Sequence, residues 1–183
     1  MRWLRPVLIV ALFTACSADA QNRATPAASP APAVAFNGAR AWTDLQKQVA
    51  FGPRPAGSMP LAQCRAYIEA ELKAAGITYR EQPFDAMTPA GVIHMINVVG
   101  TIPGKRADRI GLATHYDTKR FSDFPFVGAS DAASSTAAVL ELARGLKTRQ
   151  NEFTIELLFL DGEEAVNTEW RDPDNTDRKS TRL

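Results

Sequence analysis

Cysteine is scarce in this sequence, with two residues among 183, Cys16 and Cys64. Cys16 lies in an N-terminal segment that has the features of an export signal, so the mature domain keeps Cys64 alone and cannot form an internal disulfide. Cys64 falls on the apolar side of a predicted helix, in LAQCRAYIEAEL, where a buried and unreactive thiol is expected. The sequence therefore excludes a domain held together by disulfides.

The sequence also lacks any block of lysine or arginine, and its basic residues do not alternate with aromatic ones. The formal net charge is +1 and 45% of the residues are hydrophobic. Such a chain can bury a core, and nothing in its charge predicts a nucleic-acid partner. There are no internal repeats, and the length suits a single domain.

Residues 1–20, MRWLRPVLIVALFTACSADA, have the layout of a secretory signal peptide. Two arginines precede an apolar run that ends at Phe13 and is too short to span a membrane. The small residues that follow allow two interpretations: cleavage after Ala20, or lipidation of Cys16 as in a bacterial lipoprotein, which we favour slightly. In either case we expect an exported protein, either in the bacterial periplasm, anchored to the membrane only through Cys16, or secreted.

Residues 21–36 are rich in proline and alanine and predict a disordered linker. Residues 37–176 then carry helix and strand patterns. Helices are expected over about 39–50 and from the capping residue Ser58 to the stop signal Gly76. Strands are expected in ITYREQPF, VIHMINVVGTI, RIGLATHYD and FTIELLFLD, with a helix in AASSTAAVLELARGLK before the last of them. The nearly continuous apolar run LLFL favours a strand covered on both faces, so we predict an α/β fold, a three-layer sandwich with a mostly parallel central sheet.

Polar residues gather where these elements begin or end. His115 and Asp117 follow one strand, Asp131 precedes the helix, and Glu163 and Glu164 follow the last strand. Because ligands of open α/β sheets bind at the carboxyl ends of the strands, we expect these clusters to meet there. The carboxylates would repel one another without a cation between them. Mixed imidazole and carboxylate ligands favour zinc.

Each of these residues also has an interpretation without chemistry. Asp131 could cap the helix, and the two glutamates could be solvated loop charges. His115 could be a histidine with satisfied hydrogen bonds, and Asp117 could cap a turn. His94, within VIHMINVV, is expected to pack on a strand and is given no catalytic role. The coincidence of the clusters at one edge favours the metal site.

Three ordered motifs, HYDTK, FVGASDAASSTAAVLELAR and LLFLDGEEAV followed by EW, resemble the zinc exopeptidase family (clan MH metallopeptidases). This family includes aminopeptidases and glutaminyl-peptide cyclotransferases, also called glutaminyl cyclases. The resemblance runs from about residue 38 to about residue 176 and includes FGPRPAGS. It implies an aminopeptidase-like fold with Zn²⁺ as cofactor, one ion in a cyclotransferase and two in an aminopeptidase.

The resemblance also implies a role for each motif residue. Asp131 and Glu164 look like metal ligands, and Glu163 looks like the general acid/base. His115 corresponds to a ligand of the second metal in di-zinc members, and Asp117 would orient it. Three residues resemble the cyclotransferase pocket for an N-terminal glutamine: Lys119, Phe121 and Trp170.

The substrates implied are peptide or protein N-termini. In a cyclotransferase the γ-carboxamide of N-terminal glutamine is polarised by zinc, and Glu163 moves a proton from the attacking α-amine to the departing ammonia. In an aminopeptidase Glu163 instead activates water against the first peptide bond. The residues after HYDT and the EW pair favour the cyclotransferase. A third class, a non-catalytic binding domain with the same fold, is disfavoured because the visible motif residues are intact.

The resemblance also shows where the sequence departs from the family. The family has a further aspartate and a ligand histidine in its C-terminal half, whereas this sequence has no histidine after His115. Residues 177–183, DRKSTRL, do not continue the family pattern and are expected to be a non-native tail. We therefore expect a fragment whose C-terminal part is missing, and we expect the chain as written to be inactive.

Overall fold

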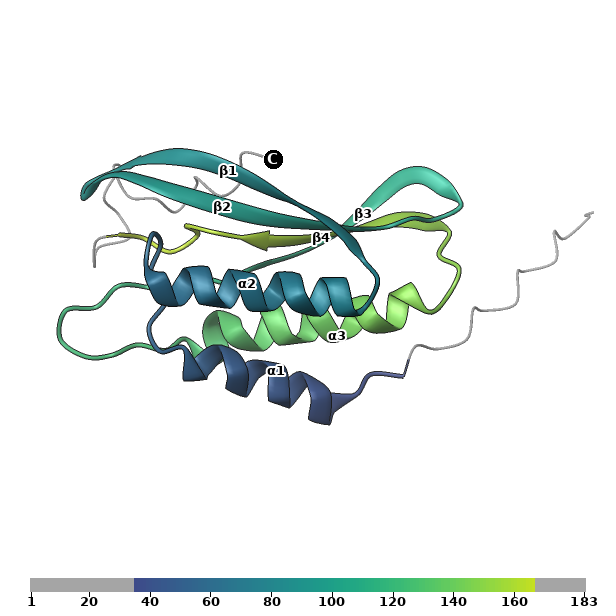
Figure 1. Ribbon diagram of the computed structural model, residues 1–183, viewed down its shortest axis with the longest axis horizontal. Coiled ribbons are helices and arrows are strands. Elements are labelled where there is room, and N and C mark those ends of the chain that lie inside the picture. Colours follow the sequence, from purple (N-terminus) through teal and green to yellow (C-terminus); the bar gives the residue numbers. More distant parts are fainter. Residues whose placement is uncertain (1–34, 167–183) are drawn as a thin grey trace, which may run out of the picture. The chain divides into compact units, whose positions relative to one another are not determined.

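The computed structural model describes residues 35–166. The predicted signal peptide, the linker up to residue 34, Trp170 and the tail at 177–183 lie outside these residues. Within them no helix is long and apolar enough to cross a membrane. The elements follow one another along the chain as α1 (Gly38–Ala50), α2 (Met59–Ala74), β1 (Thr78–Thr88), β2 (Gly91–Ile102), β3 (Arg106–His115), the irregular helical turn η1 (Ala129–Ser134), α3 (Ser135–Lys147) and β4 (Phe153–Leu160) (Figure 1).

The two N-terminal helices begin at polar caps. The side chain of Asn37 accepts a hydrogen bond from the backbone N–H of Arg40, and that of Ser58 accepts one from Leu61. These bonds satisfy N–H groups that a helix start leaves without partners. The predicted cap at Ser58 is therefore confirmed, and α2 stops two residues before Gly76.

The four strands form one mixed sheet in the order β1-β2-β4-β3. The β1–β2 and β2–β4 pairs are antiparallel, and β3–β4 is parallel. The prediction of a mostly parallel sheet is therefore wrong for the described residues. Only two residues, Pro89 and Ala90, connect β1 to β2, and so short a connection permits an antiparallel hairpin alone. The crossover through α3 makes β3 and β4 parallel.

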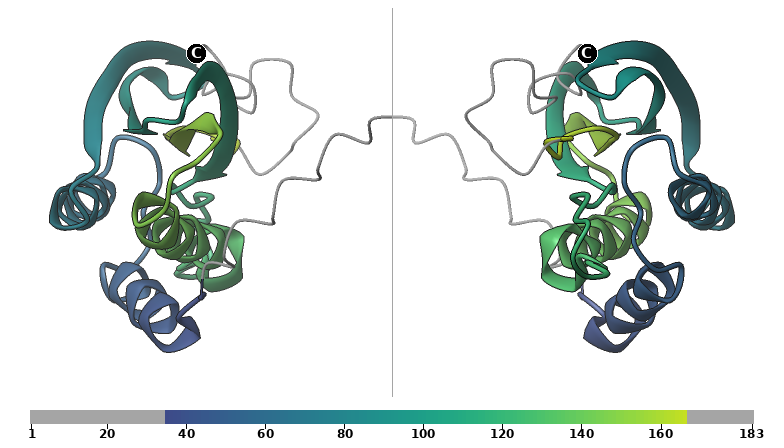
Figure 2. Two further views of the ribbon diagram at one scale, coloured as in Figure 1. Left: turned by 90° about the vertical axis from the view of Figure 1, so that its right-hand side faces the viewer. Right: turned by 90° about the vertical axis from the view of Figure 1, so that its left-hand side faces the viewer.

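All three helices lie on one side of the sheet (Figures 1 and 2). Helices α2 and α3 pack against the strands, and α1 packs against α3 and η1. Along β4, Ile155, Leu157 and Phe159 are buried, whereas Leu158 and Leu160, which alternate with them, are half-buried. Within the described residues the sheet thus has helices on one face, not on the two that a three-layer sandwich and a doubly covered LLFL strand require.

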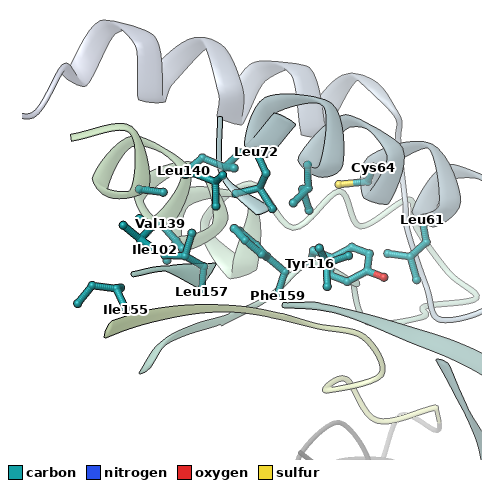
Figure 3. Close-up of a cluster of buried hydrophobic side chains, with 14 residues drawn as sticks. Leu61, Cys64, Leu72, Ile102, Tyr116, Val139, Leu140, Ile155, Leu157 and Phe159 are labelled. Carbon is teal, nitrogen blue, oxygen red and sulfur yellow. The ribbon is translucent and has the colours of Figure 1, made fainter. Parts of the chain in front are cut away.

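The core lies between the sheet and the helices α2 and α3 (Figure 3). Its fully buried side chains come from α2, α3 and the strands, among them Leu61, Cys64, Leu72, Leu140, Leu157 and Phe159. Each large apolar side chain contributes about 1.5–3 kcal/mol when it leaves water. Cys64 is buried as predicted, and burial raises the pKa of its thiol to about 11. This core holds β3 and β4 side by side and so fixes where their ends meet.

Candidate metal centre

The candidate site begins where two parallel strands end together. His115 is the last residue of β3 and is paired with Leu160, the last residue of β4. The backbone N–H of Tyr116 donates to the Leu160 carbonyl at 3.0 Å, so the two segments leave the sheet in contact. The predicted meeting of these strand ends is confirmed.

His115, Asp131 and Glu164 each offer one ligand atom, and these atoms lie within 4.8 Å of one another. The Nε2 atom of His115 lies 2.9 Å from Oδ1 of Asp131 and 3.8 Å from Oε2 of Glu163. One imidazole and two carboxylates at this spacing fit the donor set of a zinc ion. The three residues come from β3, η1 and the segment after β4, as the clusters in the sequence predicted.

Asp117 connects His115 to the segment after β4. It is fully buried, and its Oδ1 lies 3.3 Å from Nδ1 of His115. The same carboxylate accepts the backbone N–H of Glu163 at 3.4 Å and of Glu164 at 3.1 Å. Asp117 therefore fixes the orientation of the imidazole and the position of both glutamates, beyond the single contact with His115 expected from the sequence.

The electrostatics of the site show a shortage of positive charge. Burial lowers the pKa of His115, but Asp117, Glu163 and Asp131 outweigh it and raise this pKa to about 9. Burial, and then the charge on Asp117, raise the pKa of Glu164 to about 7, which His115 opposes. A divalent cation would supply the missing positive charge, which is a second reason why the donor set suits a metal.

Asp161, the first of the three carboxylates after β4, is turned away from the site. It is buried, its Oδ2 accepts the backbone N–H of Ile96 at 2.9 Å, and its own N–H donates to Oδ1 of Asn97 at 2.9 Å. Burial first, and the charge of Asp117 second, raise the pKa of Asp161 to about 7. Asp161 thus fastens the segment after β4 to β2, and the two glutamates that follow it line the site.

Asp131 lies in η1, and its side chain is 68% exposed. Its backbone is not helical, with φ −117° and ψ 101°, and α3 begins four residues later, at Ser135. The interpretation of Asp131 as the cap of α3 is therefore wrong. The turn depends on Gly128, at φ +53°, where an added Cβ would lie 2.2 Å from the carbonyl oxygen of Asp131.

The described residues predicted for the substrate pocket occupy one loop after β3. Lys119 is buried, and its Nζ donates to the carbonyl of Ala165 at 3.2 Å. The ring of Phe121 stacks on that of Phe124 with centroids 4.6 Å apart, and it meets Phe126 edge-on at 5.4 Å. The loop therefore contains both a lysine that is hydrogen-bonded to the segment after β4 and a cluster of aromatic rings. A role in substrate binding stays a prediction for both residues and for Trp170.

Two further residues complete the comparison with the sequence. His94 lies on β2 with an exposed ring, 2.8 Å from Asp85 on β1. Arg54 was not singled out from the sequence, yet its side chain is fully buried. A charged residue between two prolines, in FGPRPAGS, was the signal that could have drawn attention to it.

Comparison with known proteins agrees with this geometry. The model of peptidase family M28 matches residues 97–168. A glutaminyl-peptide cyclotransferase-like protein of Mus musculus is 41% identical over 133 residues, which are 67% of this chain and 34% of the relative. The chain belongs to peptidase family M28. Within M28 its similarity is to the glutaminyl cyclase branch.

Two solved structures resemble the fold of this chain. The crystal structure of Acidobacteriales bacterium glutaminyl cyclase has a TM-score of 0.69 and 37% identity, covering 81% of this chain and 53% of that one. A leucine aminopeptidase precursor from Bacteroides thetaiotaomicron has a TM-score of 0.71 and 28% identity, covering 78% and 53%. The chain thus spans about a third of the mouse relative and about half of these two structures.

Proposed function

We propose that the protein to which this chain corresponds is a zinc-dependent glutaminyl-peptide cyclotransferase. It would convert the N-terminal glutamine of a peptide or protein to pyroglutamate and release ammonia. The convergence of His115, Asp131 and Glu164 beside Glu163 carries this proposal. The 41% identity with a glutaminyl-peptide cyclotransferase-like protein supports this branch of the family.

Asp131 and Glu164 would hold the zinc ion, with His115 within reach as a further ligand. A bound zinc ion would supply Lewis-acid polarisation of the γ-carbonyl of the substrate glutamine. Glu163 is 41% exposed, so its carboxylate can reach both substrate and solvent. It would accept the proton of the attacking α-amine and return it to the departing ammonia. Asp117, by holding the backbone N–H of Glu163, would keep that carboxylate in place.

A zinc aminopeptidase is the second candidate, favoured by the TM-score of 0.71 with a leucine aminopeptidase precursor. The same metal-binding residues would serve, and Glu163 would take a proton from water as the water attacks the first peptide bond. The two functions therefore share every residue of the candidate centre. They differ in the substrate and the attacking group that the rest of the pocket selects: the α-amine of an N-terminal glutamine, or a water molecule.

The deciding experiment uses the full-length product of the same gene, incubated with zinc and a peptide that begins with glutamine. Release of ammonia, with a peptide lighter by one ammonia, would support the cyclotransferase. Release of free glutamine would support the aminopeptidase, and neither product would refute both. Glu163→Gln should abolish the reaction. Glu152→Gln, which alters an exposed carboxylate after α3 that pairs with Lys105, is the matched control.

We also propose that the protein is exported, on the basis of the signal-like segment at residues 1–20. Expression of the complete gene in a bacterial host, followed by mass spectrometry of the purified protein, tests this proposal. An acylated Cys16 would support the lipoprotein, and an N-terminus at Gln21 would support ordinary cleavage. A chain that keeps residues 1–20 would contradict export.

A further inference from the structure

Arg54, in the motif FGPRPAGS, has no part in the function proposed above, yet its side chain is fully buried. Burying a cation is costly unless it is bound by partners. Nη1 of Arg54 donates to three backbone carbonyls, those of Gln48 at 2.9 Å, Gly52 at 3.0 Å and Val127 at 3.1 Å. Nε donates to the carbonyl of Tyr116 at 3.4 Å. One guanidinium thus binds three separate parts of the chain.

Two of these parts carry residues of the candidate metal centre. Tyr116 stands between His115 and Asp117, and Val127 directly precedes Gly128, on which the turn with Asp131 depends. The backbone of Arg54 adds two bonds on the same side, since its N–H donates to Oγ1 of Thr118 at 2.8 Å and its carbonyl accepts from the N–H of Thr118 at 3.0 Å.

The separation of His115 and Asp131 needs such a connection. The two residues are 16 positions apart, and a loop with few regular elements runs between them. Hydroxyl groups below the site also join β3 to the start of α3: Thr136 donates to the His115 carbonyl at 2.9 Å, and the hydroxyls of Thr114 and Ser135 lie 2.8 Å apart. These bonds fix the start of α3, whereas Arg54 fixes the segment that leads into the turn of Asp131.

The charge of Arg54 also suits this place. Burial lowers the pKa of its guanidinium, and the negative charge of Asp117 opposes that change. Asp117 is the carboxylate that orients His115 and holds Glu163 and Glu164. A lysine would keep the charge, but a single ammonium cannot reproduce the planar fork that reaches both Tyr116 and Val127.

We propose that Arg54 is a positioning residue of the metal centre. It holds the segment after β3 and the segment before η1 on one guanidinium, and so sets the distance between His115 and Asp131. This inference rests on the proposed metal site. The motif FGPRPAGS would then serve the site by positioning its metal ligands, although none of the three candidate ligands lies in the motif.

The test titrates the full-length product of the same gene with Co²⁺ alone and follows the visible absorption of the bound ion, whose spectrum reports the coordination geometry. Arg54→Met and Arg54→Lys are compared with Arg144→Met and Arg144→Lys. Arg144 is a half-buried arginine, bound to Asp44 at 2.6 Å and Glu71 at 2.8 Å in the helix layer. Thermal unfolding of each variant is measured beside the titration, so that a loss of affinity can be separated from a loss of stability.

We expect Arg54→Met to weaken Co²⁺ binding about tenfold or more, as changes of residues that support metal ligands do, and to change the absorption spectrum. Arg54→Lys should recover part of the affinity. The Arg144 variants should lose stability and keep the affinity and spectrum of the unchanged protein. If Arg54→Met does not fold, Arg54→Lys alone tests the inference, because it keeps the positive charge and loses the hydrogen bonds that join Tyr116 to Val127. Its affinity should then be lower than that of the unchanged protein.

Two results would overturn the inference alone: wild-type affinity and spectrum in both Arg54 variants, or equal losses of affinity in the Arg54 and Arg144 variants. An unchanged protein that binds no Co²⁺ would instead refute the metal site, and with it this role of Arg54. The failure of the inference and the failure of the proposed function are therefore distinguishable.

Discussion

Replacing Gly162 by alanine tests whether the segment that carries Glu163 and Glu164 is held by packing against β2. Gly162 has φ +70°, and a Cβ at this position would lie 2.3 Å from Sδ and 2.9 Å from Cε of Met95. Met95 is fully buried, in a cluster with Ala56 and Ala86. Its thioether can therefore give way only by disturbing other buried groups.

The expected cost has two parts. Alanine in a left-handed conformation loses about 1–2 kcal/mol, and overpacking a filled site adds about 1–3 kcal/mol. Gly91 is a matched control, because its φ is +96° and nothing lies within 4 Å of the Cβ that alanine would add. Gly91→Ala should therefore cost only the conformational part. The difference between the two variants measures the packing of Met95 against the segment after β4.

Urea unfolding followed by circular dichroism gives both free energies, and a Co²⁺ titration of the same samples gives the affinity of the site. We expect Gly162→Ala to lower the free energy of unfolding by about 2–5 kcal/mol in total and to weaken Co²⁺ binding, whereas Gly91→Ala keeps the affinity. Equal destabilisation by the two variants would refute the reasoning, because it would show that Met95 yields at no cost.

Three other predictions follow from the burial and charge of single residues. Glu141 is buried and bound to Arg40, which together with Arg144 holds the pKa of Glu141 below its usual value. Ionised Glu141 therefore stabilises the folded chain above about pH 4.3, the pKa of an unfolded glutamate, and this stabilisation is lost as the pH falls through the lower pKa of the folded state. Glu141→Gln should cost about 3 kcal/mol at pH 7 in urea unfolding and flatten this acid dependence; an unchanged pH profile would contradict it. In a Cys16→Ser variant, Cys64 should not react with a thiol reagent at about pH 8 until the chain unfolds, because burial excludes the reagent and keeps the thiol protonated; immediate reaction of the folded protein would count against this. Zinc should raise the melting temperature of the full-length product of the gene, reversibly with a chelator, and Asp131→Asn should remove most of that rise; an equal rise in the variant would exclude Asp131 as a ligand.

Signals that act within one element were sufficient to predict α2. Its cap at Ser58, its apolar residues at spacings of three and four, and Gly76 after its end are local features, and the structure has the helix where they placed it. The meeting of the polar clusters was also predictable, because a strand, a helix and a second strand in succession form a right-handed crossover with both strand ends on one edge. The two-residue connection between β1 and β2 is likewise a local feature, and it is the one that indicates an antiparallel hairpin.

The sequence by itself thus determined the helices, the strands and the edge of the sheet at which the candidate centre lies. Only the tertiary structure decided which contacts hold each of the clustered carboxylates in place. Asp161 turns towards β2 because its carboxylate accepts the backbone N–H of Ile96 and its own N–H donates to the side-chain oxygen of Asn97. The positive φ of Gly162 then directs the following glutamates towards His115. Arg54 likewise acquires its partners from segments far apart along the chain. Such contacts depend on how distant segments pack, and no pattern within a single element encodes that packing.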